Sequence, residues 1–255
     1  MRLTVLGSGN GVPSATRGCP GFLLRGAGET VLFDPGPGTL AAAARVGVDA
    51  GAVTGVLLSH LHIDHHLDLA ALLFALRSPR FAGRPPLRVL GPAGLLRTYA
   101  LWREAYGHWV EPAGYDLDLA EAGPGDHRLG ALRLEAVAVP HGARPALGWR
   151  VRESEDGPVL ALSGDTGEGP GAIEVGRGAD LFVLECTLPE GEPTVKHLTA
   201  SAAGRTAAAA GCRRLLLVHF SSRVEGTPVE EAVRAAWGGP LVLAHDGTEA
   251  EVLKP

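Results

Sequence analysis

The sequence predicts an α/β (α+β) fold built from short apolar strands and helices, and three observations predict it. Both halves of the chain are rich in predicted strands and then continue into a predicted helix. Several strands end in a polar residue that can bind a metal. The 255 residues are 45% hydrophobic and 20% charged, a composition typical of a globular protein. This length suits one large domain or two small ones.

The overall charge argues against one class of partner. The formal net charge is −5, and the arginines are spread thinly, with Arg213-Arg214 as the only adjacent pair. A dedicated nucleic-acid-binding protein usually carries a basic patch or stripe. The composition therefore predicts that nucleic acid is not the main partner, while a local basic patch stays open.

The cysteines and the N-terminus bear on the compartment. Cys19, Cys186 and Cys212 are odd in number and far apart, which favours reduced thiols over a disulfide framework. The apolar run within Met1–Gly7 is too short for a signal peptide. No apolar run approaches the ~18 residues of a membrane span. We therefore expect no membrane partner and a cytoplasmic location.

The first third of the chain is predicted to alternate strands with helices. The strands are expected at Leu3–Leu6, Phe22–Leu24, Thr30–Phe33 and Val53–Leu58, and the helices at Leu40–Val46 and Leu67–Arg77. The Gly-rich loop after the first strand, Gly7 to Ser14, is not a phosphate-binding loop, because no Gly-Lys-Ser/Thr follows it. Thr39 is suited to cap the first helix.

The segment from Ser78 to Gly130 is the least informative. One strand is expected between Arg84 and Pro92, and one helix at Leu95–Tyr106. Trp102, Tyr106 and Trp109 are spaced to gather on or near one helix face. Packing into the core is the favoured interpretation, with a substrate wall or a dimer face as alternatives.

The second half carries strands whose ends are polar. They are expected at Leu132–Val139, Leu147–Arg152, Pro158–Ser163, Ala179–Leu184, Leu215–Val218 and Leu241–Ala244. An Ala-rich helix should run to about Ala210, and Thr227 is suited to cap a later one. Metal-capable residues gathered from such strand ends at one edge of a sheet sandwich would form a site on a rigid scaffold.

The richest cluster of metal-capable residues is His60-Leu61-His62-Ile63-Asp64-His65. In an extended segment the side chains of His60, His62 and Asp64 can point the same way. His65 falls where a helix should begin, so it can turn with Asp64 toward a second position. Imidazole and carboxylate suit zinc and similar ions. A cluster of this density favours metal binding over surface or core histidines without a ligand role.

This pattern, His-X-His-X-Asp-His, resembles the metallo-β-lactamase superfamily. The resemblance implies a four-layer αββα sandwich formed as a single domain over residues 1–255. It also implies that His60, His62 and His141 hold one metal, that Asp64, His65 and His219 hold the second, and that Asp165 bridges the two. Asp34 would support the histidine loop from beneath. His66 lies outside the family pattern and is interpreted as a residue at the helix start, on the surface or behind the ligands.

Three further stretches resemble ribonuclease Z-like members of the superfamily. They are Lys196-His197-Leu198-Thr199-Ala200, His219-Phe220-Ser221-Ser222-Arg223 and Glu185-Cys186-Thr187. The resemblance implies that His197 protonates the leaving group or binds the phosphate, that Glu185 orients His197, and that Asp64 also orients the nucleophile. Ribonuclease Z itself has a long tRNA-binding arm between the positions of His141 and Asp165, and residues 142–164 leave no room for one. This chain resembles the shorter, arm-less phosphodiesterases of the family.

The resulting hypothesis is a dinuclear metal-dependent hydrolase of small phosphodiesters such as cyclic nucleotides. Two cations about 3.5–4 Å apart can lower the pKa of a shared water and stabilise charge on the reacting oxygens. The expected cofactors are two divalent ions, with zinc as the default and manganese or iron also compatible. The alternatives are a lactone, thioester or β-lactam hydrolase, tRNA 3′ processing, and a non-enzymatic accessory protein. The expected partner is a small phosphodiester rather than nucleic acid, and the resemblance leaves a homodimer open.

Overall fold

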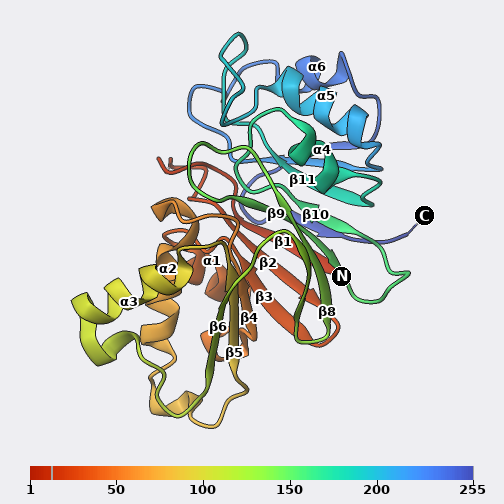
Figure 1. Cartoon of the computed structure of the whole chain (residues 1–255). Helices are drawn as coiled ribbons and strands as arrows, with labels where there is room; N and C mark the ends of the chain where they lie inside the picture. Colours follow the sequence, from red (N-terminus) through yellow and green to blue (C-terminus); the bar gives the residue numbers. More distant parts are fainter. Residues whose placement is uncertain (13, 255) are drawn as a thin grey trace.

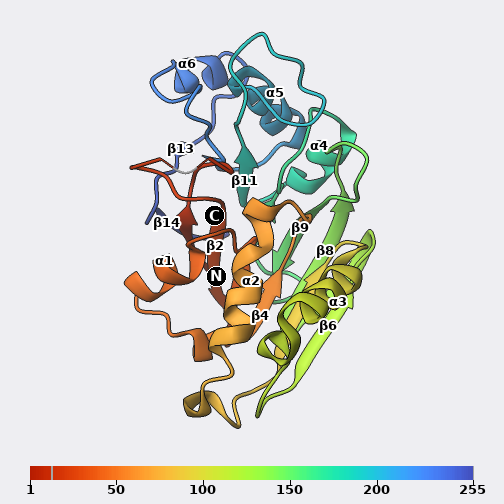
Figure 2. The same ribbon diagram turned by 90° about the vertical axis from the view of Figure 1, so that its left-hand side faces the viewer.

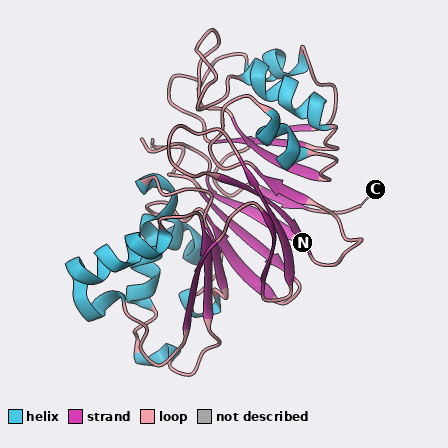
Figure 3. Ribbon diagram, viewed as in Figure 1, coloured by secondary structure: helices cyan, strands magenta, loops and turns pink. Residues whose placement is uncertain are grey.

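Two seven-stranded sheets pack face to face in the computed structural model, which describes residues 1–12 and 14–254 (Figure 1). In the first sheet the order is β14-β1-β2-β3-β4-β5-β6, and in the second it is β13-β12-β11-β10-β9-β8-β7. Helices cover the outer face of each sheet, so the layers run helix, sheet, sheet, helix (Figure 3). The predicted αββα sandwich is confirmed.

The first sheet and its helices come from residues 1–121, with a last strand from the C-terminus. The strands are β1 (Arg2–Gly7), β2 (Gly21–Gly26), β3 (Glu29–Phe33), β4 (Gly55–Leu57), β5 (Leu87–Gly91), β6 (Leu117–Glu121) and β14 (Glu249–Glu251). The helices are α1 (Thr39–Arg45), α2 (Ile63–Ala75) and α3 (Leu95–Tyr106), with short 3₁₀ turns at Ala50–Ala52, Pro79–Phe81 and Gly107–Val110. Figure 2 views this helical layer from outside.

The second sheet follows in the rest of the chain. Its strands are β7 (Gly125–Leu129), β8 (Leu132–Ala138), β9 (Leu147–Arg152), β10 (Leu160–Leu162), β11 (Leu181–Glu185), β12 (Leu215–Val218) and β13 (Leu241–Leu243). Its helices are α4 (Pro170–Gly176), α5 (Ala200–Ala210) and α6 (Val229–Arg234).

Period-two alternation in the strands produces three apolar layers. Along β2, Phe22 and Leu24 face the space between the two sheets, while Leu23 faces the helices α1 and α2. Trp149 on β9 is fully buried between the sheets and donates its indole N–H to the carbonyl of Leu58 at 3.0 Å. This bond ties the second sheet to the end of β4, where the histidine loop begins.

The sequence prediction missed four short elements, namely β6, β7, β14 and α4. The three strands lie at sheet edges and are rich in charged residues, as in the run from Leu117 to Glu121. Edge strands bury little apolar surface, so their sequences resemble loops. Helix α4 is a seven-residue segment that starts with Pro170 and contains two glycines, which lowers its helix propensity.

Two predicted helix caps are wrong. Helix α1 begins at Thr39 itself, after Gly38, and the Thr39 hydroxyl donates to the carbonyl of Pro20 at 3.4 Å. Helix α6 begins after Pro228, and the Thr227 hydroxyl donates to the carbonyl of Val224 at 2.7 Å. In both cases the hydroxyl that was expected to cap the helix forms a hydrogen bond with a backbone carbonyl outside the helix instead.

The aromatic residues of the α3 region divide between two environments. Trp102 packs against the layer beneath α2 and α3, and its ring stacks on His66 with centroids 5.5 Å apart. Tyr106 and Trp109 are each 52% exposed. Core packing is therefore correct for Trp102 only, and His66 is buried rather than on the surface.

Three other expectations concern the chain as a whole. Cys19, Cys186 and Cys212 are all free and buried. Across residues 1–12 and 14–254, none of the helices has the length and hydropathy needed to cross a membrane. Pro13, within the predicted Gly-rich loop, lies outside the described residues.

Gly36 sets the distance between the loop after β3 and the start of α2. A Cβ atom at this position would overlap the backbone carbonyl of Asp64 and lie 2.7 Å from that of Pro20. We expect Gly36→Ala to destabilise the fold by about 2–3 kcal/mol, because backbone atoms must move to admit the methyl group. Urea denaturation measures this change.

Gly123→Ala is the matched control, because a Cβ there would have no described atom within 4 Å. Equal unfolding free energies for the two variants would show that the loop after β3 adjusts freely and does not position α2.

Candidate metal centre

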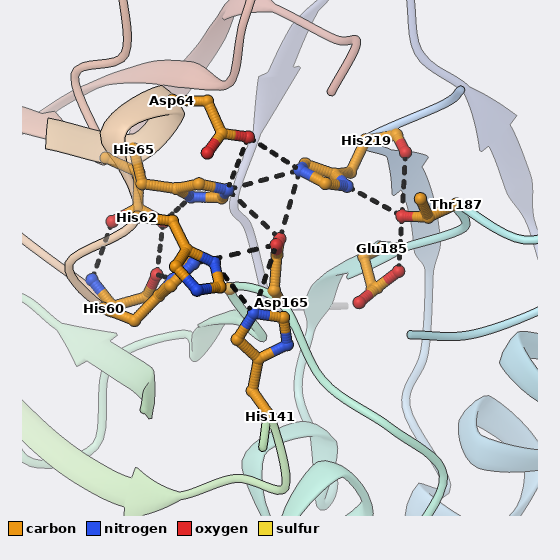
Figure 4. A network of polar contacts seen from close by, with 12 residues as sticks. His60, His62, Asp64, His65, His141, Asp165, Glu185, Thr187 and His219 are labelled. Atoms are coloured by element: carbon orange, nitrogen blue, oxygen red, sulfur yellow. Dashed lines mark hydrogen bonds and ion pairs between the residues drawn. The ribbon is translucent and has the colours of Figure 1, made fainter. Parts of the chain in front are cut away.

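The predicted site residues gather at one edge of the sandwich, where strands from both sheets end (Figure 4). Asp34 follows β3, and the histidine loop follows β4 and enters α2. From the second sheet, His141 follows β8, Asp165 follows β10, Glu185 ends β11 and His219 follows β12. The backbone at Asp34 (φ 45°) and at His219 (φ 60°) is left-handed, a strained conformation that is concentrated at functional sites.

One group of potential ligands consists of His60, His62, His141 and Asp165. One ligand atom from each lies within 4.8 Å of the others. Oδ2 of Asp165 is 3.7 Å from Nε2 of His60 and 3.7 Å from Nε2 of His141. These are the residues that the family resemblance assigned to the first metal, together with the carboxylate that it assigned as the bridge.

A second group consists of Asp64, His65 and His219, again within 4.8 Å of one another. The other oxygen of Asp165, Oδ1, is 3.2 Å from Nε2 of His65 and 3.2 Å from Nε2 of His219. The two oxygens of one carboxylate therefore face the two groups separately. This is the geometry that a bridging ligand requires.

The burial of these side chains fits a pair of divalent cations. Nε2 of His60 and Oδ1 of Asp165 are buried without a hydrogen-bond partner in the described part of the chain. Buried polar atoms left unpaired are costly, so such atoms indicate a ligand or ion. An open side is provided by His62, which is exposed, and by Asp64, which is partly exposed. We conclude that the donor atoms and the burial of these residues are compatible with two divalent cations.

Two pKa shifts also fit this assignment. Burial holds the pKa of His60 well below its ordinary value, which favours the neutral imidazole that binds metals. Burial on its own would raise the pKa of Asp165, but the nearby His219 and His65 outweigh it and hold that pKa well below the usual range. Asp165 therefore stays ionised at the centre of the cluster.

Asp34 supports the histidine loop from beneath through three hydrogen bonds. Oδ1 accepts from the backbone N–H of Ser59 at 2.7 Å. Oδ2 accepts from the Ser59 hydroxyl at 2.5 Å and pairs with Nδ1 of His65 at 2.9 Å. The carboxylate is 1% exposed and orients His65 so that its Nε2 faces the site.

His197 and Glu185 lie together beside the ligand groups. Nδ1 of His197 is 2.8 Å from Oε1 of Glu185 and 3.9 Å from Oδ2 of Asp165. The His197 side chain is 25% exposed, so it lies at the mouth of the site. Burial lowers the pKa of His197, but the hydrogen bond and charge of Glu185 outweigh it and raise the pKa to about 9.

The Gly-rich loop also borders the site. A Cβ on Gly11 would lie 3.0 Å from Oδ2 of Asp64, so this loop passes close to a ligand carboxylate. Asp246 fixes the base of the loop by accepting the N–H groups of Ser8 and Gly18, each at 2.8 Å. The sequence prediction missed this role of Asp246, because it depends on a contact between the two ends of the chain.

Comparisons with known proteins agree with this geometry. A family model described as the Beta-lactamase superfamily domain matches residues 29–220. The chain belongs to the β-lactamase superfamily. Ribonuclease Z from Thermobifida fusca is 32% identical over 96% of this chain and 92% of its own length. Ribonuclease Z from Streptomyces coelicolor is 31% identical over 99% and 98%.

Two solved structures share this fold. The short form of human tRNase Z has 26% identity and a TM-score of 0.78, with 99% of each chain covered. The metallo-beta-lactamase fold protein YhfI from Bacillus subtilis has a TM-score of 0.83 at 22% identity, with 98% of each chain covered, and shows the shared fold. The β-lactamase superfamily member described here is accordingly a metal-dependent hydrolase of the ribonuclease Z-like branch.

One sequence prediction is wrong. We expected that nucleic acid is not the main substrate, on the grounds of the acidic charge and the short segment between His141 and Asp165. The ribonuclease Z relatives, which match nearly the whole chain, contradict this expectation. Net charge describes the entire surface and gives no information about the local potential around one active site.

Proposed function

We propose that the protein is a phosphodiesterase in which His60, His62, His141, Asp64, His65, His219 and Asp165 hold two divalent cations. The observation that carries this proposal is the His197–Glu185 pair next to the ligand groups. Nδ1 of His197 is held by the carboxylate at 2.8 Å, so its other nitrogen is available to a substrate at the mouth of the site. Cleavage of a phosphodiester needs such a donor for the departing oxygen.

The roles of the side chains follow from their positions. His197 donates its Nδ1–H to the carboxylate of Glu185, which leaves Nε2 on the other side of the ring available. Through Nε2, His197 can donate a proton to the leaving oxygen or bind a phosphate oxygen. Asp64 is partly exposed beside His65 and His219, at 3.6 Å and 3.8 Å, where it can orient an attacking water. When bound, the two cations supply Lewis-acid stabilisation of the charge that develops on the phosphoryl oxygens. The ligand set of imidazoles and carboxylates favours zinc, and it also accepts manganese or iron.

RNA is the first candidate substrate. The relatives named ribonuclease Z cover 96–99% of this chain, and the short human tRNase Z shares its fold throughout. Both names describe nucleases that cut RNA phosphodiesters. The names of these relatives therefore make RNA the first phosphodiester to test.

A small phosphodiester is the second candidate, favoured by the length of one segment. Between His141 and Asp165 the chain contains only a short loop and the strands β9 and β10. The alignment with the Thermobifida fusca protein spans 296 positions, more than the 255 residues of this chain, so that relative carries residues that are absent here. The site is open at His62 and Asp64, so it also admits compact phosphodiesters such as cyclic nucleotides.

The test compares three substrates with zinc- or manganese-loaded protein and with protein stripped by a chelator. They are a tRNA precursor with a 3′ extension, bis(p-nitrophenyl) phosphate and a lactone. We expect metal-dependent cleavage of one or both phosphodiesters and little turnover of the lactone. Precursor cleavage places the protein with the ribonucleases, whereas activity on the small diester alone supports the second candidate. Lactone turnover with both phosphodiesters inert, at two metals per chain, would contradict the proposal.

A further inference from the structure

The carboxylate of Glu185 is fully buried and accepts four hydrogen bonds. Oε1 is 2.8 Å from the N–H of Thr166 and 2.8 Å from Nδ1 of His197. Oε2 is 2.6 Å from the Thr187 hydroxyl and 3.2 Å from the N–H of Leu198. Four donors use every lone-pair position of an ionised carboxylate. Glu185 therefore acts only as an acceptor, and the Thr187 hydroxyl gives its proton to Oε2.

Because the hydroxyl proton of Thr187 is used by Glu185, the tautomer of His219, the next residue in this series of hydrogen bonds, is determined as well. Thr187 has a single hydroxyl proton, so its oxygen must act as the acceptor toward Nδ1 of His219, 2.7 Å away (Figure 4). The carbonyl of His219, at 3.0 Å, is a longer and uncharged alternative acceptor for that proton. Nδ1 of His219 carries the hydrogen, and Nε2 is left with a free lone pair directed at Asp165 and at His65.

The opposite side of the site repeats this arrangement. The Ser59 hydroxyl donates to the buried carboxylate of Asp34 at 2.5 Å, and its oxygen is 2.9 Å from Nδ1 of His60. By the same count Nδ1 of His60 donates, and its Nε2 is one of the buried atoms without a hydrogen-bond partner in residues 1–12 and 14–254. Each buried carboxylate thus holds one histidine directly and a second one through a hydroxyl.

We propose that Thr187 is a positioning residue that holds His219 in the tautomer with a free Nε2. Through Glu185, the same hydroxyl joins a metal-binding histidine to the proton-donating His197. The inference rests on the metal assignment of the proposed function, but it does not require any particular substrate. Hydrogen bonds that fix the orientation and tautomer of a ligating histidine typically change metal affinity or activity by about 10- to 100-fold.

The test measures the dissociation constant for zinc by competition with a chromophoric chelator, in the absence of substrate. We expect Thr187→Val, which keeps the shape and removes the hydroxyl, to weaken zinc binding about 10- to 100-fold. Thr187→Ser keeps the hydroxyl and should bind zinc nearly as well as the wild type. Thr206→Val is the matched control, because the buried Thr206 hydroxyl has no partner among the described residues, and it should leave zinc affinity unchanged.

A second variant covers the case in which Thr187→Val does not fold. Thr187→Ala removes the hydroxyl without placing a methyl group against His219, where the hydroxyl oxygen is 2.7 Å from Nδ1. It should weaken zinc binding to a similar extent as Thr187→Val. Wild-type affinity in Thr187→Val or in Thr187→Ala, or equal losses in the Ser and Val variants, would overturn the role of Thr187. If wild-type protein binds no zinc at all, the metal assignment itself fails.

Discussion

Replacing Asp165 with alanine is expected to lower metal-dependent phosphodiester cleavage by about 100- to 1,000-fold, the scale on which removal of one preorganised charge-stabilising group acts. One oxygen of this carboxylate lies 3.7 Å from His60 and His141, and the other lies 3.2 Å from His65 and His219. In the proposed ligand set, its removal takes a ligand from both cation positions at once. Metal content per chain, measured by mass spectrometry, should fall together with the rate.

Asp180→Asn is the matched control for this experiment. Asp180 is also buried, but its carboxylate accepts the N–H of Val159 at 2.8 Å and pairs with Arg213 at 3.4 Å, away from the metal centre. We expect this variant to lose stability and to keep its metal content. Two metals per chain and an undiminished rate in Asp165→Ala would show that Asp165 does not bridge the two positions.

The second large effect is expected from His197→Ala, and it should depend on the leaving group. A general acid contributes about 10²- to 10⁴-fold when the departing oxygen needs a proton. Cleavage that releases a nucleotide hydroxyl should therefore fall by this factor. Bis(p-nitrophenyl) phosphate releases a p-nitrophenolate that leaves without a proton, so its hydrolysis should fall much less. Metal content should not change.

The contrast between the two substrates separates two roles of His197. A residue that only binds phosphate would affect both substrates equally, and equal losses would reject the general-acid role. His127→Ala is the control, because His127 is a partly exposed histidine that bonds the carbonyl of Gly123 at 2.7 Å outside the site. It should leave both rates unchanged.

Much of the candidate site could be predicted because its members follow strand ends in a fixed order. His60, His62, Asp64 and His65 occupy one loop, and local spacing alone indicates a metal site. His141, Asp165 and His219 are far apart in sequence, and only the resemblance to a family connected them. The structure brings all seven together, since the strands β4, β8, β10 and β12 end at the same edge of the sandwich.

The fold was predictable where apolar strands are buried and less so at the edges. The strands β1 to β4 and β9 to β12 consist mostly of buried residues, so hydrophobic runs identify them, and β8 has buried residues at every second position from Leu132 to Ala136. The polar strands β6 and β7 and the short helix α4 carry little of that signal. Their conformation depends on pairing with a neighbouring strand or packing on the sheet, which no local window contains.

The sequence by itself predicted an α/β fold and a metal site at the histidine loop, and the family resemblance added the other candidate ligands together with His197 and Glu185. Only the tertiary structure decided that Asp165 presents one oxygen to each ligand group, and that Ser59 and Thr187 link buried carboxylates to His60 and His219. Residue types restrict which atoms can bind a metal or donate a proton. The direction in which each lone pair points depends on hydrogen bonds between segments that are distant in sequence, and these exist only when both sheets have packed.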